Sequence, residues 1–427
     1  MRRLFTLDLH DYDENWEHDL RPTVRGIIEK DGKLALVYKR ENDYYGFPGG
    51  GINEGETYEE ALIREVKEET GLIVIPESIT EYGGALRLNK STRFPEKVFE
   101  QENYNYKCEV LDAVGEQNLD EEEAQEGFEL AFVTMEEARR KNRYDDHGSD
   151  NGGIWLEREN ILIEMQMFEK KLAKEPLEIK NGIYYFDAYN DGDFFDEEDA
   201  AEWDNGRLES NWKKRKFLEN PTTKKLVETI VANGKEIIDL ACGPGMGLIP
   251  SVKQLDPAFH CTATDANAMV LEHWKKYLDF HCMTHGVGFA QFSVLDMPFK
   301  DGSVPAFSSN IGLSSVRGGQ EDYDKAVKEV YRCLEPGGYL YAIESEWMDV
   351  NAILQVFEKW GQEPWTCFSE KQMSWHDRFL AAGFEIISEE LVQTRVFTED
   401  DNELGEASVK FGIPVVTKET AFVLRKK

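Results

Sequence analysis

A glycine-rich turn followed by a glutamate-rich helix constrains the fold of this chain more than any other feature of the sequence. The segment GFPGGGINEGETYEEALIREVKEETGL occupies residues 46–72. Within it, TYEE has the pattern of a capping box, which predicts that a helix begins at Thr57. Gly71 suits the C-terminal end of that helix, because glycine readily adopts the left-handed conformation. We therefore expect a loop, a helix and a second loop in this order.

Three glutamates of the predicted helix gather on one side of it. At about 100° per residue, Glu65, Glu68 and Glu69 share one arc, beside an apolar arc formed by Leu62, Ile63 and Val66. Like charges on one arc repel by roughly a few tenths of a kcal/mol per pair. A solvated acidic face is one interpretation. Mg²⁺ or Mn²⁺ would instead turn the repulsion into binding, because hard divalent cations take carboxylate oxygens.

The same segment resembles the Nudix box, whose pattern is G-x5-E-x7-R-E-U-x-E-E-x-G-U, with U an aliphatic residue. Every fixed position is filled, by Gly50, Glu56, Arg64, Glu65, Val66, Glu68, Glu69, Gly71 and Leu72. The resemblance implies that residues 1–172 form a Nudix α/β/α sandwich with a mixed sheet. It also implies an activity, the attack of water on a phosphorus of a nucleoside diphosphate linked to another moiety.

The resemblance assigns roles to the residues of the box. Glu65, Glu68 and Glu69 would be the catalytic metal ligands, and the Gly49 carbonyl a further one. Gly50, Glu56, Arg64 and Gly71 would hold the loop–helix–loop shape. A glutamate outside the box often completes such sites, and the sequence leaves five candidates open: Glu116, Glu121, Glu122, Glu123 and Glu126.

Aromatic residues near the box have two interpretations. Tyr44, Tyr45 and Phe47 would stack on a base or pack in the core, and we favour packing.

The second half of the chain alternates strand-like and helical segments, which indicates a mostly parallel, doubly wound sheet. A charge-dense run at residues 168–182 precedes it, and we take residues 173–183 as the linker and 184–427 as the second domain. GFEIISEELV and ETAFVLRK are expected to form an antiparallel pair at the edge of that sheet. The predicted parallel strands are EIIDLA, FHCTATD, FAQFSVLD, VPAFSSN and GGYLYAIE.

A glycine-rich turn follows the first of these strands. IIDLACGPGMGLIP spans residues 237–250, and its glycines allow a ligand to approach the backbone closely. Leu248 stands where a dinucleotide fingerprint requires glycine. Asp265 is expected to end the second strand and to accept the ribose hydroxyls. Asp296 is expected to end the third strand and to accept the adenine amino group, with Met297 beside the ring.

This order of motifs resembles class I S-adenosylmethionine-dependent methyltransferases of the quinone-biosynthesis type. The resemblance implies a Rossmann-like sheet and a cofactor site formed by Asp239, Ala241, Gly243, Gly245, Asp265, Asp296 and Met297. Ala241 replaces the first glycine of the usual motif, and the acid common at the start of the fourth strand is absent. The acidic run at residues 189–212 is expected to cover the cofactor or to form a solvated helical pair.

Methyl transfer from S-adenosylmethionine is an in-line displacement in which the enzyme mainly positions the acceptor. A general base is left open among His281, His285, Glu344, Glu346 and His376.

Charge and composition limit the partners. The formal net charge of −34 opposes non-specific binding to nucleic acid, which needs clustered lysine and arginine. The sequence has no C-x-x-C pair, no apolar N-terminal signal and no run long enough to span a membrane, so we expect a cytoplasmic protein.

The sequence thus predicts a bifunctional enzyme that acts on a nucleotide-derived substrate and a small-molecule methyl acceptor. Two alternatives remain: one half serves as a nucleotide-sensing module, or the two halves process and methylate RNA 5′ ends. Both substrates and the oligomeric state are left open.

Overall fold

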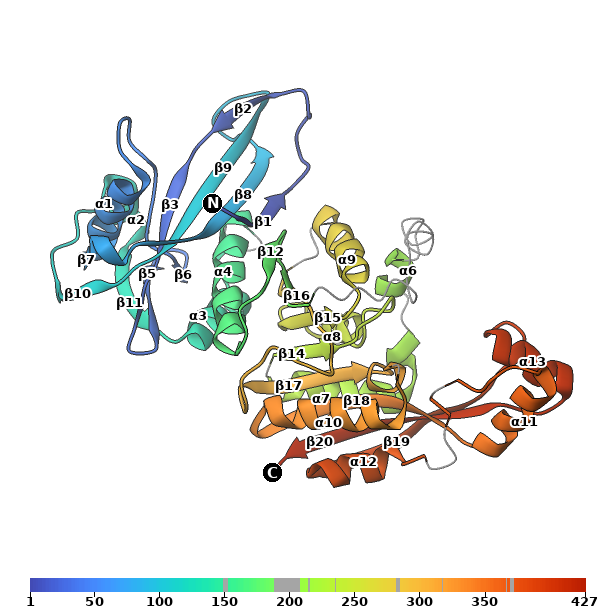
Figure 1. Cartoon of the computed structure of the whole chain (residues 1–427). Coiled ribbons are helices and arrows are strands. Elements are labelled where there is room, and N and C mark those ends of the chain that lie inside the picture. Colours follow the sequence, from blue (N-terminus) through green and yellow to red (C-terminus); the bar gives the residue numbers. More distant parts are fainter. Residues whose placement is uncertain are drawn as a thin grey trace. The chain divides into compact units, whose positions relative to one another are not determined.

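A computed structural model describes most of the chain, namely residues 1–148, 153–187, 208–213, 216–234, 236–281, 285–316, 318–365, 367–368 and 372–427. These residues divide into two compact units (Figure 1). The first unit comprises Met1–Lys170, Glu178–Tyr184 and Lys275–Gly288. The second comprises Lys171–Leu177, Tyr185–Trp274 and Phe289–Lys427. In the described part of the chain, no helix is both long and apolar enough to cross a membrane.

The first unit contains a mixed sheet of five strands. Its strand order is β1-β8-β9-β2, and β3 also pairs with β9. The pairing of β8 with β9 is antiparallel, whereas β1, β2 and β3 each pair in parallel. The strands are β1 (Arg3–Asp8), β2 (Glu17–Leu20), β3 (Thr23–Ile27), β8 (Thr80–Lys90) and β9 (Lys97–Lys107).

A second sheet of this unit is built around β5 (Lys33–Lys39), which pairs with β4 (Glu29–Lys30), β6 (Tyr44–Gly46) and β11 (Phe128–Val133). A turn at Asp31-Gly32 joins β4 to β5, and both residues have the positive φ of a tight hairpin. A separate ribbon pairs β7 (Leu72–Val74) with β10 (Val110–Val114). Two short strands, β12 (Glu178–Lys180) and β13 (Ile183–Tyr185), occupy part of the segment expected as a linker.

The predicted glutamate helix is α1 (Tyr58–Thr70). Thr57 is its N-cap with a complete capping box, and Gly71 ends it in the left-handed conformation, as the sequence predicted. Ala61, Leu62 and Val66 are buried in the core of the unit. The remaining helices are the 3-10 turn η1 (Pro76–Ser78), α2 (Glu121–Glu126), α3 (Met135–Tyr144) and α4 (Ile154–Lys170).

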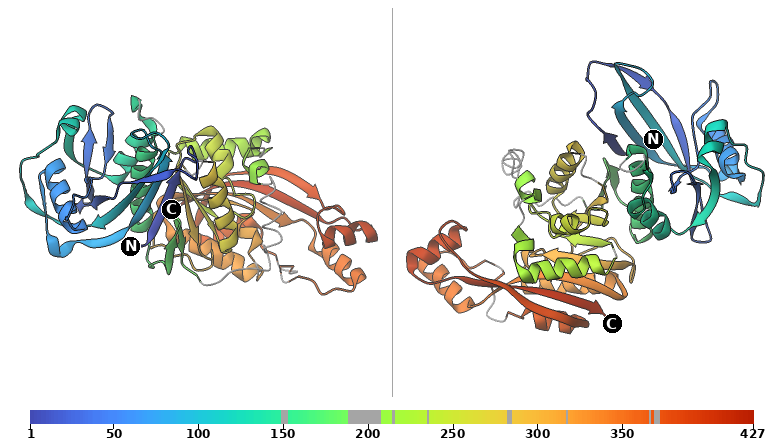
Figure 2. Two further views of the ribbon diagram at one scale, coloured as in Figure 1. Left: turned by 90° about the horizontal axis from the view of Figure 1, so that it is seen from above. Right: turned by 180° about the vertical axis from the view of Figure 1, so that it is seen from behind.

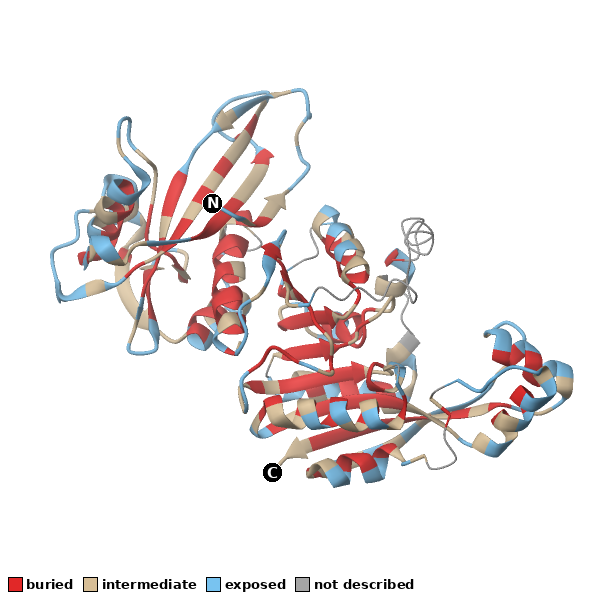
Figure 3. Cartoon of the chain, in the orientation of Figure 1, coloured by how far each residue is buried: buried red, intermediate tan, exposed pale blue. Residues whose placement is uncertain are grey.

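Helix α4 was not foreseen, because its sequence is rich in charge. It is nevertheless buried along most of its length (Figure 3). Arg143 of α3 forms ion pairs with Glu157 and Glu164 of α4, so these charges are satisfied inside the unit.

The second unit holds seven strands in the order β16-β15-β14-β17-β18-β20-β19. The order reverses at β14, so the carboxyl ends of β14 and β17 border a crevice typical of doubly wound folds. The predicted doubly wound sheet is therefore confirmed. The strands are β14 (Ile237–Leu240), β15 (Cys261–Asp265), β16 (Val287–Gln291), β17 (Val304–Asn310), β18 (Leu334–Trp347), β19 (Phe384–Val396) and β20 (Val416–Lys426).

Helices connect these strands, and the central strands are largely buried (Figure 3). The helical elements are α6 (Leu208–Lys213), η4 (Lys216–Glu219), α7 (Pro221–Ala232), α8 (Ile249–Leu255), α9 (Ala268–Phe280), η5 (Leu313–Ser315), α10 (Gln320–Cys333) and α12 (Trp375–Ala382). Helix α6 includes residues 208–212 of the acidic run, and residues 189–207 lie outside the described residues.

The predicted antiparallel pair, β19 with β20, is confirmed and extends beyond the main sheet. Two helices sit at its far end, α11 (Val350–Trp360) and α13 (Glu403–Phe411) (Figure 2). They share a small core of their own, which includes Ile353, Phe357 and Leu404. The sequence analysis did not predict this helical extension.

Candidate functional site

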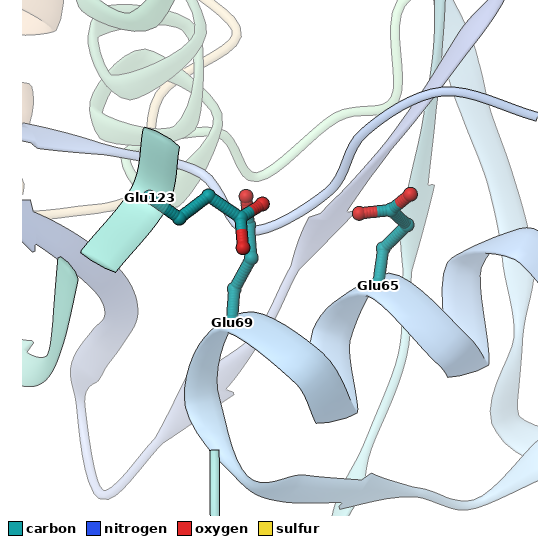
Figure 4. Close-up of side chains that lie close together, drawn as sticks. All are labelled: Glu65, Glu69 and Glu123. Atoms are coloured by element: carbon teal, nitrogen blue, oxygen red, sulfur yellow. The ribbon is translucent and has the colours of Figure 1, made fainter. Parts of the chain in front are cut away.

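Three glutamates of the first unit converge on one point. Glu65 and Glu69 lie one turn apart on α1, and Glu123 reaches towards them from α2 (Figure 4). One carboxylate oxygen of each lies within 4.8 Å of the others. The backbone N–H of Asp120 donates to Glu123, which fixes the glutamate at the start of its helix. Of the five glutamates that the sequence left open, Glu123 is the one in this cluster.

Glu68 lies outside this cluster, although the sequence analysis grouped it with Glu65 and Glu69. Its carboxylate accepts a 3.1 Å hydrogen bond from Arg64, which lies one turn earlier on the same side of α1. Its side chain is also 33% exposed, compared with 10% for Glu65. The cluster therefore depends on a residue of α2 that is distant in sequence.

Arg64 ties the preceding loop to α1. Its guanidinium donates to both oxygens of Glu56 at 2.8 Å and to the Gly51 carbonyl at 2.9 Å. This pairing lowers the pKa of Glu56 to about 2. The loop before the helix is thus clamped in one position by a charge-assisted, bidentate contact.

Two glycines let this loop touch the glutamates. The Gly49 N–H donates to Glu69 at 2.7 Å. A Cβ on Gly49 would lie 2.1 Å from the Val24 carbonyl oxygen, and a Cβ on Gly50 would lie 2.4 Å from a carboxylate oxygen of Glu65. No other residue type fits at these two positions without displacing the backbone or a carboxylate.

Burial raises the pKa of all three clustered carboxyl groups, that of Glu69 to about 8. Three carboxylates so close together are not all ionised without a compensating positive charge. A divalent cation provides that charge and takes oxygen ligands. The cluster therefore fits Mg²⁺ or Mn²⁺.

A cavity of about 420 Å³ adjoins the cluster. Glu69 and Glu123 line one part of it, and cationic side chains line another: Arg21, Arg25, Lys39, Arg87 and Arg158. None of the arginines was singled out in the sequence, because single arginines in strands and an unforeseen helix carry no spacing signal. Tyr44 and Phe47 also line the cavity but are each only 3% exposed, in keeping with the packing role that we favoured.

The second unit has a cavity of about 560 Å³ at the carboxyl ends of β14, β15 and β17. Ala241, Gly243 and Gly245 of the glycine-rich turn line it, whereas Asp239 is fully buried beneath the turn. A Cβ on Gly247 would lie 1.4 Å from Asp239. Ala241 and Gly243 both have positive φ, which bends the chain around the cavity.

Asp265 also lines this cavity, at the end of β15. Its carboxylate accepts from the N–H groups of Gly243 and Asn267, at 2.9 Å each. The carboxylate is thereby held beside the glycine-rich turn.

The structure corrects the expectation for Asp296 and Met297. Strand β16 ends at Gln291, so the chain has turned before it reaches either residue. The Asp296 side chain is 77% exposed and pairs with Lys174 at 2.5 Å. Met297 is buried and does not line the cavity, whereas residues 293–295 do.

Two family models match the chain, one in each half. A family model of the NUDIX domain matches residues 19–150, and a model of the ubiE/COQ5 methyltransferase family matches residues 211–367. The chain joins a NUDIX domain to a ubiE/COQ5 methyltransferase domain.

Individual relatives resemble one half each. An ADP-ribose pyrophosphatase from Methanocaldococcus jannaschii is 55% identical over 53 residues, which are 12% of this chain and 31% of the relative. A demethylmenaquinone methyltransferase from Listeria welshimeri is 26% identical over 175 residues, 40% of this chain and 68% of the relative. The crystal structure of the MccD protein aligns with 49% of this chain and 99% of the MccD chain. The two are 15% identical in sequence, and the TM-score is 0.36.

The methyltransferase domain has a further cavity of about 940 Å³ beside the cavity at the glycine-rich turn. Ile311, Ser315 and Val316 line both, so the two spaces adjoin. Aromatic side chains and two arginines form much of its wall: Tyr323, Trp347, Trp365, Trp375, Phe397, Arg378 and Arg395. Several of these residues follow residue 367, beyond the segment that the family model matches.

Of the five candidate bases in the methyltransferase half, Glu346 is the one that lines the larger cavity. Glu344 is fully buried, and accepts from the Ser309 hydroxyl at 2.5 Å and the Ser314 N–H at 2.9 Å. His376 pairs with Glu389, and His285 with Glu157. The ring of His281 packs at a tilt against that of Tyr277, with the centroids 4.6 Å apart.

Proposed function

We propose that this chain is a bifunctional enzyme. Its NUDIX domain hydrolyses a nucleoside diphosphate linked to another moiety, and its methyltransferase domain transfers a methyl group from S-adenosylmethionine to a small-molecule acceptor. The observation that carries the first activity is the cluster of Glu65, Glu69 and Glu123 beside a cavity lined by arginines. The pyrophosphatase and methyltransferase relatives support both halves.

In the NUDIX domain, Glu65, Glu69 and Glu123 would hold Mg²⁺ or Mn²⁺, with the Gly49 carbonyl as a further ligand. When bound, such a cation neutralises the diphosphate and lowers the pKa of the attacking water. Arg64 and Glu56 position α1 against the glycine loop. Arg25, which lines the cavity near the glutamates, is placed to bind a phosphate oxygen.

In the methyltransferase domain, Asp265 would accept the ribose hydroxyls of S-adenosylmethionine, and the turn from Ala241 to Gly245 would cradle the rest of the cofactor. The acceptor would occupy the adjoining aromatic cavity of about 940 Å³. Glu346, a carboxylate that lines that cavity, is the proposed base for acceptors that lose a proton. Trp375 donates its backbone N–H to Glu346 at 2.7 Å and so orients it.

Hydrolysis is tested by phosphate release from a panel of nucleoside diphosphate conjugates with Mg²⁺ or Mn²⁺. Glu69→Gln and Glu123→Gln should each lower kcat by at least about a hundredfold, because each removes a carboxylate from the cluster. The exposed Glu121→Gln on the same helix as Glu123 is the matched control and should keep wild-type activity. Full activity in both cluster variants would refute the assignment.

Cofactor binding is tested by calorimetric titration with S-adenosylmethionine. Asp265→Ala should weaken binding by at least about tenfold, because a buried ribose hydroxyl loses a charged acceptor. Asp296→Ala should leave the affinity unchanged, because that side chain points to solvent and Lys174. Equal losses in the two variants would show that the cofactor lies elsewhere.

A further inference from the structure

Three arginines line the NUDIX cavity without a carboxylate partner. Lys39 pairs with Glu126, and Arg158 pairs with Glu159, so these two cations of the cavity are neutralised. Arg21, Arg25 and Arg87 form no ion pair with any residue that the structure describes. In a chain with 83 acidic and 49 basic residues, three such arginines around one cavity indicate a site for an anion.

Arg87 is held rigidly rather than left free in solvent. Its guanidinium carbon lies 5.0 Å from the ring centroid of Phe99 and 5.1 Å from that of Trp155. Its Nε donates to the Asn89 side-chain oxygen at 2.9 Å. Both terminal nitrogens are thereby left as donors on a pre-oriented plane, which suits a carboxylate or phosphate.

The charged groups that act on Arg87 are all cationic. Burial and the nearby Arg158 and Arg21 lower the pKa of Arg87 to about 10. Arg25 differs, because burial and Arg158 lower its pKa whereas Glu159, Glu69 and Glu65 act in the opposite sense. An anion beside Arg87 would relieve the repulsion among these cations.

Two groups of charged residues that line the cavity matter here. Glu69 and Glu123 belong, with the adjacent Glu65, to the glutamate cluster, which suits a metal-bound diphosphate. Arg21 and Arg87 form the second group, and no acid is among the charges that act on Arg87. A diphosphate held at the glutamate cluster does not by itself neutralise this second group.

We propose that the NUDIX substrate carries a second anionic group, a carboxylate or a phosphate ester apart from its diphosphate, which binds between Arg87 and Arg21. The inference rests on the proposed hydrolase function and narrows its substrate class. The rings of Trp155 and Phe99 hold Arg87 in place, and Arg87 acts in binding rather than in the chemical step.

Binding without metal separates this proposal from the hydrolase activity. Titrations in EDTA should compare two pairs of probes: UDP-glucose with UDP-glucuronate, and ADP-ribose with 2′-phospho-ADP-ribose. In at least one pair, the probe with the extra anionic group should bind about tenfold more tightly than the probe without it. The pair that shows the difference identifies which side of the diphosphate carries the group. Equal affinities within both pairs would overturn the proposal even if hydrolysis is observed.

Arg87→Gln should abolish the preference for the extra anionic group and leave the affinity for UDP-glucose and ADP-ribose unchanged. Arg93→Gln is the matched control, because this arginine is exposed in the loop after β8 and lines no part of the cavity. Thermal unfolding reports whether Arg87→Gln folds, and Arg87→Lys should restore part of the preference in a folded protein. If Arg87→Gln weakened the binding of probes with and without the extra anionic group equally, Arg87 would have a structural role instead.

Discussion

Buried carboxylates are the residues whose surroundings the sequence conceals most. Glu344 of β18 is fully buried, accepts hydrogen bonds from Ser309 and Ser314, and does not line the cavity of about 940 Å³. Burial raises its pKa to about 7. A candidate base thus becomes, in the structure, a residue that holds the turn after β17.

Glu344 should make the stability of the protein depend on pH. Its folded pKa is raised from 4.5 to about 7, so its contribution is fully present below pH 4.5 and is lost as the pH rises through 7. Glu344→Gln keeps the shape without the charge. We expect the variant to gain up to about 3 kcal/mol relative to wild type between pH 5 and pH 9.

Urea unfolding of both proteins at the two pH values measures this difference. The exposed Glu358→Gln on α11 serves as the control and should show none. A constant difference between Glu344→Gln and wild type across this range would contradict the prediction.

At the scale of elements, the short helix α2 completes the glutamate cluster. It has only six residues, yet Asp120 caps its first turn and Gly127 ends it in the left-handed conformation. Asp120 accepts from the N–H groups of Glu122 and Glu123, so the cap also positions the glutamate of the cluster. The position of Glu123 therefore depends on the cap.

Removal of this cap should weaken metal binding. Asp120→Ala should lower Mg²⁺ affinity by about tenfold, as loss of a group that orients a metal ligand commonly does. Thr134→Ala removes an equivalent capping box from α3, and should cost about 1 kcal/mol of stability without changing Mg²⁺ affinity. Calorimetric titration with Mg²⁺ distinguishes the two variants. Equal Mg²⁺ affinities in both would show that the cap of α2 is not needed to position Glu123.

At the scale of the whole molecule, the two candidate active sites lie in different compact units. The glutamate cluster belongs to the first unit and the glycine-rich turn to the second. Each ligand should therefore stabilise only the unit that binds it, since a ligand raises stability by binding the folded state.

Differential scanning calorimetry should show this selectivity. S-adenosylmethionine at about a hundred times its Kd should raise the Tm of one transition by roughly 5–10 °C. Mg²⁺ should raise the Tm of the other transition. Glu69→Gln should lose this Mg²⁺-dependent shift and keep the shift caused by S-adenosylmethionine. A shift of both transitions by either ligand would show that the units unfold together.

The sequence by itself determined the doubly wound sheet of the second half and the loop–helix–loop of the NUDIX box. These features depend on local signals: a capping box at Thr57, a left-handed glycine at position 71, and regular alternation of strands and helices. Such signals act over a few residues, so the chain carries them without reference to its tertiary contacts.

Only the tertiary structure decided which charged groups meet. It placed Glu123 of α2 beside Glu65 and Glu69, turned Asp296 away from the cavity at the glycine-rich turn, and brought Arg87 of β8 and Arg21 to one cavity. These residues are far apart in the chain or lie beyond a turn whose direction the sequence does not specify. Their surroundings depend on how strands and helices pack, and packing is a property of the whole fold.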